Sequence, residues 1–299
     1  MELSQKFVRR QLERLQPLLS ACSIEINRKG QDAMGKFMQT LYRHEVEFVP
    51  AEVPGLEASW AVPKEAGLEG GVILYLHGGG YTCGDLEYAK GFGAVLAAET
   101  GLRVLCPAYR LAPEYPYPAA LEDAAACYRL LLDQGLDPKR IVLAGESAGG
   151  GLIFCLCLWL KENGLPLPGG LIGISPWTDL TSSGASFETN RERDPSMTRD
   201  QLQFFAKCYT GAPEDPLASP LFGDLSGLPR SLLFVGGDEV MLSDAEDLHE
   251  KLLTAGCESR LIVGPELWHA YILYSLKERR CDMEEIVAFA RGVVLCPEN

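Results

Sequence analysis

The segment IVLAGESAGGG, residues 141–151, leads from an apolar run into a cluster of glycine and alanine around one serine, Ser147. Its first four residues are typical of a buried strand, and residues 148–163 form an apolar segment of helix length. Gly145 and Gly149 complete a G-x-S-x-G pattern, which at a strand–turn–helix junction holds a nucleophile on a sharp turn. We therefore predict Ser147 as a nucleophile. The alternative is a loose glycine-rich turn whose serine has no chemical role.

Short apolar runs on both sides of this segment alternate with segments of helix length. Continuous apolar runs indicate strands buried on both faces, and their alternation with helices predicts a doubly wound, mostly parallel α/β sheet. Two earlier segments, 44–49 and 56–62, alternate in polarity and predict an antiparallel pair of strands. The buried strands are predicted at 72–76, 103–106, 141–144, 171–174, 232–235 and 260–263, and the helices at 88–99, 118–134, 148–163, 244–255 and 283–292.

Two further segments do not belong to this alternation. Residues 3–42 have helical periodicity, and the insert at 183–219 is longer than one crossover helix needs. Within the insert, Thr198 is a candidate N-cap of a helix whose aromatic face carries Phe204, Phe205 and Tyr209. We expect both segments to form a helical cap, because ligand crevices of α/β sheets lie at the carboxyl edge of the strands. A decorative helix is the alternative for the insert. The predicted division is 1–42 and 183–219 for the cap and 43–182 and 220–299 for the core.

Composition restricts the classes of partner. The chain has 27 basic and 41 acidic residues and a net charge of −14, which disfavours nucleic acid and anionic membrane surfaces as partners. The first 19 residues lack the apolar core of a signal peptide, and no apolar stretch has the length of a membrane span. The ten cysteines include no CxxC pair, which favours reduced, mostly buried thiols and no metal site. We expect a cytoplasmic protein.

A nucleophilic serine needs a base and an acid that orients the base. Of the four histidines, His269 follows the last predicted strand, at the sheet edge where a base is required. Asp238 ends the strand at 232–235 at the same edge and is the favoured acid, with Glu239 and Asp244 as rivals.

A third motif, His77-Gly78-Gly79-Gly80, follows the strand at 72–76. Bare glycine backbone can direct N–H groups at a developing oxyanion, and the N–H of Ala148 would complete that site. For His77 itself we expect a role in bracing the loop. The aromatic face of the insert predicts an apolar, size-limited pocket, and Trp177 either edges that pocket or packs in the core.

In these motifs the chain resembles the hormone-sensitive-lipase-like carboxylesterases of the α/β-hydrolase superfamily. The resemblance implies an eight-stranded, mostly parallel sheet with a helical cap, and hydrolysis of short- to medium-chain acyl esters without metal or organic cofactor. It implies Ser147 as nucleophile, Asp238 as acid, His269 as base, and the N–H groups of Gly79, Gly80 and Ala148 as the oxyanion hole, Gly78 being less certain. It also makes a homodimer through the last strand and helix plausible. The motifs that carry it are LYLHGGGY (74–81), YRLAPEYPYPAALED (109–123), GESAGG (145–150), SPWTDL (175–180), GGDEV (236–240) and WHAY (268–271).

Three positions depart from the family's usual pattern. Ala108 stands where an aspartate often precedes YRLAPE, and Ala270-Tyr271 replaces a frequent Gly-Phe. The segment DEVMLSD (238–244) replaces D-P-L-x-D, which leaves the acid open between Asp238 and Asp244. None of these changes removes a catalytic atom.

The expected reaction is attack of Ser147 on a small-molecule ester, followed by hydrolysis of the acyl-enzyme. Hydrolysis of amides, lactones or carbamates by the same triad remains open, because the fold does not decide the substrate. A ligand receptor on an inactive hydrolase scaffold is a further alternative, although such a protein usually loses the base, and His269 is present.

Overall fold

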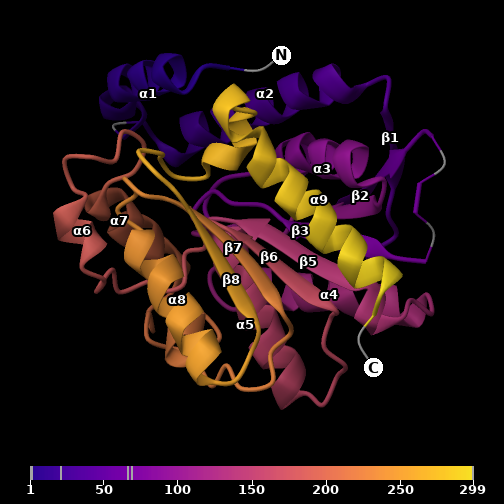
Figure 1. Cartoon of the computed structure of the whole chain (residues 1–299). Helices are drawn as coiled ribbons and strands as arrows, with labels where there is room; N and C mark the ends of the chain where they lie inside the picture. Colours follow the sequence, from indigo (N-terminus) through magenta and orange to yellow (C-terminus); the bar gives the residue numbers. More distant parts are fainter. Residues whose placement is uncertain (1–2, 21, 66, 69, 298–299) are drawn as a thin grey trace.

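The sheet of this protein has six parallel strands and an antiparallel pair at one edge. The computed structural model describes residues 3–20, 22–65, 67–68 and 70–297, and within them one eight-stranded sheet has the order β1-β2-β4-β3-β5-β6-β7-β8 (Figure 1). β2 runs antiparallel to both β1 and β4, and β3 to β8 are parallel, which confirms the predicted fold class. The strands are β1 (Val46–Pro50), β2 (Ala58–Pro63), β3 (Val72–Leu76), β4 (Arg103–Pro107), β5 (Ile141–Glu146), β6 (Gly170–Ile174), β7 (Ser231–Gly236) and β8 (Ser259–Gly264).

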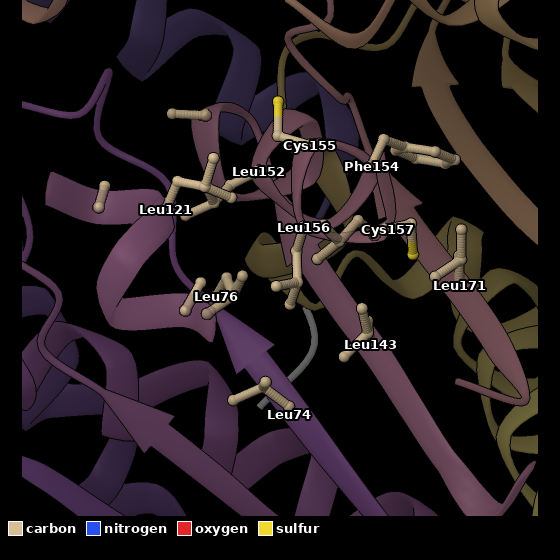
Figure 2. Close-up of a cluster of buried hydrophobic side chains, with 14 of the residues drawn as sticks. Leu74, Leu76, Leu121, Leu143, Leu152, Phe154, Cys155, Leu156, Cys157 and Leu171 are labelled. Carbon is tan, nitrogen blue, oxygen red and sulfur yellow. The ribbon is translucent and has the colours of Figure 1, made fainter. Parts of the chain in front are cut away.

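Apolar side chains cover both faces of the sheet. Along β3, Leu74 and Leu76 join the core on one face, whereas Ile73 and Tyr75 join the core on the other. Figure 2 shows the first of these cores, where Leu74 and Leu76 lie near Leu143 of β5 and Leu156 of the helix that follows β5. Burial on both faces explains why the central strands have continuous apolar sequences.

Helices cover the two faces of the sheet. α4, α5 and α8 contribute to the core that contains Leu74, and α3 and α9 contribute to the core that contains Ile73. Each begins within about four residues of its predicted position. Their bounds are α3 (Leu86–Thr100), α4 (Ala119–Asp133), α5 (Ala148–Glu162), α8 (Leu242–Thr254) and α9 (Arg280–Leu295).

The two segments predicted to form a cap supply the remaining α-helices. Thr198 is the N-cap of α7 and forms a reciprocal capping box with Gln201, as expected for a helix beginning there. α2 packs closely on α3, because a Cβ atom at Gly35 would lie 2.2 Å from the carbonyl oxygen of Glu87. The bounds are α1 (Gln5–Ser20), α2 (Ile24–Tyr42), α6 (Ser186–Thr189) and α7 (Arg199–Tyr209).

The burial of the cysteines and the length and polarity of the helices can be compared with what the composition predicts. All ten cysteines lie in the described part of the chain and form no disulfide within it, and six of them are buried. The prediction that most of the thiols are buried is confirmed. Within residues 3–20, 22–65, 67–68 and 70–297, every helix is too short or too polar to cross a membrane.

Candidate active site

Ser147 occupies the turn between β5 and α5. Its backbone has φ 56° and ψ −123°, a left-handed conformation that non-glycine residues rarely adopt. The turn is closely packed, since a Cβ atom at Gly149 would lie 2.0 Å from the carbonyl oxygen of Leu76. The backbone of Ser147 is fixed on both sides, its N–H donating to the carbonyl of Ile174 and its carbonyl accepting from the N–H of Trp177, both at 2.9 Å. The loose-turn alternative is therefore excluded.

The glycine loop after β3 lies beside this turn. Gly79 and Gly80 have positive φ angles of 112° and 61°. Among the described residues, no group accepts a hydrogen bond from the N–H of Gly79, Gly80 or Ala148. The N–H of Gly78, in contrast, donates to Oε1 of Glu146 at 2.6 Å. The structure thus leaves three of the four candidate donors available to an oxyanion.

Glu146, next to Ser147 in the chain, holds the glycine loop through a hydrogen bond. Its carboxylate accepts hydrogen bonds from the Tyr75 hydroxyl and from the N–H of Gly78, both at 2.6 Å. His77 is fully buried and stacks on Tyr109 at 4.2 Å between ring centroids, and Tyr109 donates its hydroxyl hydrogen bond to the His77 carbonyl at 2.6 Å. Burial lowers the pKa of His77 to about 4. A histidine that stays neutral inside the core fits the predicted bracing role.

His269 follows β8 and forms its side-chain hydrogen bond with Glu239. The two groups are 2.9 Å apart, with Nδ1–H of the imidazole donating to Oε2 of the carboxylate. The other oxygen, Oε1, accepts from the Ser175 hydroxyl and from the N–H of Gly236, both at 2.5 Å. The Ser175 hydroxyl oxygen in turn accepts from the N–H of Ala270 at 3.0 Å. A fully buried carboxylate is therefore held by three donors, one of which is the imidazole.

Asp238, predicted to contact His269, lies elsewhere. Its carboxylate is paired with Arg9 of α1, at 2.8 Å from Nη1, and with Arg193 of the insert. The prediction of Asp238 as the carboxylate beside His269 is corrected to Glu239. The physical reason is that consecutive side chains leave the backbone in different directions. The side chain of Asp238 points toward Arg9 and Arg193, which are distant in the sequence, and pairs with them.

Asp244, the other alternative for the acid, binds backbone groups of a loop. Its Oδ2 accepts hydrogen bonds from the N–H groups of Thr178 and Asp179, each at 2.9 Å. Asp244 therefore holds the loop after β6 and does not contact His269.

Burial and hydrogen bonding act oppositely on the two titratable groups of the site. Burial alone would lower the pKa of His269, but its hydrogen bond to Glu239 and the negative charge of that carboxylate raise the pKa above the ordinary value for histidine. Burial raises the pKa of Glu146 to about 7, although its hydrogen bonds from Tyr75 and Gly78 act in the opposite direction. The pKa values of both groups are thus raised, that of His269 by its partner Glu239 and that of Glu146 by burial.

A cavity of about 450 Å³ lies between Ser147, His269 and the glycine loop. Ser147, His269, Gly79 and Gly80 all line it, so the structure brings the predicted nucleophile, base and glycine loop to one space. Its other walls come from α1, α2, the insert and the segment after His269. They include Leu12, Gln16, Ile26, Asn27, Gln31, Met34, Pro195, Ser196, Met197, Gln201, Leu202, Phe205, Leu273 and Tyr274.

The predicted aromatic pocket is confirmed at Phe205 and wrong at Phe204 and Tyr209, and Trp177 takes the second of its two predicted positions, in the core. Phe205 lines the cavity, next to Gly80. Phe204 points outward with half of its surface exposed. Tyr209 is buried and stacks on Tyr81 at 3.7 Å, and Trp177 is fully buried at 6.1 Å from the same ring. Helical periodicity identified the aromatic face of α7, but neighbouring elements decide which part of that face meets the cavity.

Sequence reasoning missed several groups at the site. Ser175 and the helix residues Leu12, Ile26 and Gln31 were not singled out, although Ser175 begins the quoted motif SPWTDL and follows a strand end, which is a usable signal. The residues of α1 and α2 carry no comparable signal, since their distance in sequence from the core gives no indication of which side chains reach the cavity.

Known proteins are similar to this chain in sequence and in fold. A family profile described as alpha/beta hydrolase fold matches residues 73–273. A protein of Streptomyces hygroscopicus named acetyl-hydrolase is 41% identical over 238 residues, covering 78% of this chain and 79% of that protein. The crystal structure of a double mutant of the esterase E40 superposes with a TM-score of 0.90 at 36% identity, covering 98% of this chain and all of the other. An esterase described as belonging to the bacterial hormone-sensitive lipase family superposes with a TM-score of 0.86 at 34% identity, over 98% and 100% of the two chains. The chain therefore belongs to the α/β-hydrolase family, as a member of its group of hormone-sensitive-lipase-like esterases.

Proposed function

We propose that this protein is a serine carboxylesterase in which Ser147, His269 and Glu239 form the catalytic triad. The contact that carries the proposal is the 2.9 Å hydrogen bond between Nδ1 of His269 and Glu239, in a cavity that also contains Ser147 on its strained turn. With Nδ1–H donated to the carboxylate, Nε2 of the imidazole is left as the basic nitrogen.

The mechanism follows from these placements. His269 accepts the proton of the Ser147 hydroxyl as its oxygen attacks the ester carbonyl, and the N–H groups of Gly79, Gly80 and Ala148 bind the resulting oxyanion. His269 then protonates the leaving alcohol as the carbon–oxygen ester bond breaks. Water, deprotonated by the same imidazole, attacks the acyl-enzyme and releases the acid and free Ser147. Glu239 accepts the hydrogen bond from Nδ1–H and stabilises the imidazolium in both steps.

The walls of the cavity support an acyl substrate of limited size. A volume of about 450 Å³ lies within the range of small-molecule sites, and apolar side chains from α1, α2 and α7 line it. We propose that these helices act as a cap that shields the oxyanion from water, and that short- to medium-chain esters fit beneath it.

The test is the initial rate on p-nitrophenyl esters from acetate to laurate, for the wild type beside Ser147→Ala. We expect a maximum at a short or medium chain and loss of activity in the variant. Activity that survives in Ser147→Ala would contradict the nucleophile. Hydrolysis of matched anilides but not of esters would contradict the proposed substrate class.

A further inference from the structure

The charge of this chain is distributed unevenly along its length. Residues 1–43 contain eight basic and four acidic residues, whereas the remaining 256 residues contain 19 basic and 37 acidic ones. The net charge of −14, from which we expected no anionic membrane as a partner, is therefore not the charge of the N-terminal segment. An asymmetry of this kind indicates a surface that binds an anionic partner.

α1 carries a stripe of basic side chains on its outer face. Lys6, Arg10 and Arg14 follow one another at intervals of four residues, which places them on one side of the helix. All three are exposed, and among the described residues no carboxylate pairs with them. Phe7, beside this stripe, has 57% of its surface exposed, whereas Val8 on the opposite face is buried in the core. α1 is thus a basic amphipathic helix with an apolar side chain among its outward charges.

α2 carries an apolar stripe on its outer face. Its members have between 38% and 63% of their surface exposed and lie on one side of the helix, and they are Ile26, Met34, Phe37 and Leu41. Ile26 and Met34 also line the cavity, so the stripe begins at the cavity mouth. Phe37 and Leu41 continue it away from the mouth. The opposite side of α2 buries Met38 in the core.

The two stripes form one outward surface, which we call the cap surface. α1 and α2 lie along the same end of the molecule and line the same cavity (Figure 1). Because each helix turns its buried face to the core, the basic and the apolar stripe both face outward. The acidic residues of these helices do not cancel the basic stripe, because each pairs with another basic residue: Glu13 with Arg9, Glu25 with Lys29 and Asp32 with Lys36.

We propose that the cap surface docks on a lipid bilayer that contains anionic headgroups. The basic stripe binds lipid phosphates, and the exposed apolar side chains enter the boundary between headgroups and acyl chains, as in helices that lie in a membrane interface. A bilayer fits this position better than a protein, because a partner seated here covers the cavity mouth. Apolar esters dissolve in a bilayer, so substrate can enter the cavity from the lipid. This choice of partner rests on the proposed function.

The experiment measures co-sedimentation of the full chain with vesicles of phosphatidylcholine that contain about 30% phosphatidylglycerol, at about 0.1 M salt. Arg10→Gln/Arg14→Gln removes two charges of the basic stripe. The matched control, Arg129→Gln/Lys139→Gln, removes two exposed charges from the opposite end of the sheet. Lys139 precedes β5, whereas Ser147 follows it, and Arg129 lies near the end of α4 that leads toward Lys139.

A second pair of variants tests the apolar stripe. Phe37→Ser removes a side chain with 63% of its surface exposed, outside the lining of the cavity. Its control is Leu253→Ser, in the last turn of α8, where 51% of the leucine is exposed.

We expect the partition coefficient to fall about tenfold in Arg10→Gln/Arg14→Gln and about threefold or more in Phe37→Ser, and less than about twofold in either control. For the wild type alone, binding should weaken strongly on vesicles of pure phosphatidylcholine and at about 0.5 M salt, because salt screens the basic stripe. This series decides the question even where a variant unfolds.

Three outcomes would overturn the proposal. The first is a wild type that does not bind the anionic vesicles. The second is an equal loss of binding in the test variants and their controls. The third is a wild-type dimer that dissociates in Phe37→Ser and does not bind vesicles, which would mean that a second copy of this chain covers the apolar stripe. Failure of the proposed function is distinguishable, because Ser147→Ala should bind vesicles as the wild type does, whereas hydrolysis of p-nitrophenyl butyrate is measured without vesicles.

Discussion

Glu239 and His269 share a hydrogen bond of 2.9 Å, whereas Asp238, one residue earlier, is paired with arginines from α1 and the insert. Two adjacent carboxylates at the end of β7 thus face different partners. One orients the imidazole of the site. The other connects the core to both segments that line the cavity.

This division predicts unequal effects of neutralising the two carboxylates. Glu239→Gln should lower kcat/KM on p-nitrophenyl butyrate about 10³- to 10⁴-fold, because the amide no longer fixes the tautomer or stabilises the imidazolium. Asp238→Asn should lower it less than tenfold and act mainly on thermal stability, because Arg9 and Arg193 lose their charged partner. Steady-state kinetics and the melting temperature of both variants measure this. A larger loss of kcat/KM in Asp238→Asn would restore Asp238 as the acid.

The pH dependence of activity should report the raised pKa of His269. The imidazole must be neutral to accept the serine proton, and a raised pKa keeps it protonated to higher pH. We therefore expect kcat/KM to rise with pH through a midpoint above 6.5, the ordinary value for histidine.

In Glu239→Gln the same midpoint should move to lower pH. The influences of Glu239 that raise the pKa are then gone. Burial, the largest influence, still lowers the pKa, while the charges of Asp194 and Glu146 continue to raise it by smaller amounts. The measurement is kcat/KM between about pH 5 and 9 for both enzymes, with Ser147→Ala as the background. A midpoint that stays in place would mean that another group controls the acid limb.

Glu146 predicts a pH-dependent effect on stability. Its folded pKa of about 7 lies above the ordinary 4.5, so folding favours the protonated form. The contribution of this group to stability is complete below pH 4.5 and is lost as pH rises through about 7.

Glu146→Gln stays uncharged at every pH and should escape this loss. The difference in melting temperature, variant minus wild type, is therefore expected to grow between pH 5 and 8. Thermal unfolding at several pH values measures it. Glu87→Gln is a suitable control, because the pKa of Glu87 is lowered and the difference should not grow in that direction. A constant difference for Glu146→Gln would contradict the raised pKa.

The strained backbone of Ser147 predicts that replacing this residue by glycine removes activity but increases stability. Its φ of 56° strains a side chain with a Cβ atom, whereas glycine adopts this conformation freely. Ser147→Gly should be inactive and more stable by about 1 kcal/mol, and Ser147→Ala should be inactive without that gain. Melting temperatures of both variants test this. Equal stability of the two would mean that the turn is not strained.

Much of the fold could be read from local patterns. The apolar strands, the antiparallel edge pair and the helices between them follow from hydrophobic periodicity, because burial on both faces of a parallel sheet requires continuous apolar runs. The elbow at Ser147 and the loop of Gly79 and Gly80 were predictable for a related reason. Their conformations require small residues at particular positions, so a short stretch of sequence reveals them.

The carboxylate beside His269 and the cavity walls were not predictable in this way. Local sequence left Asp238, Glu239 and Asp244 as alternatives, and the choice depended on Arg9, Arg193 and the loop at Thr178, which approach from other parts of the chain. The aromatic face of α7 likewise divided between the cavity, the core and solvent.

By itself, the sequence determined the sheet, its helices and the sharp turn at Ser147, because each depends on residues that are neighbours along the chain. Only the tertiary structure decided that Glu239 orients His269 and that Gln31 reaches the glycine loop. Both are contacts between segments that no local pattern relates, and the direction of a side chain at such a contact is set by what occupies the space around it.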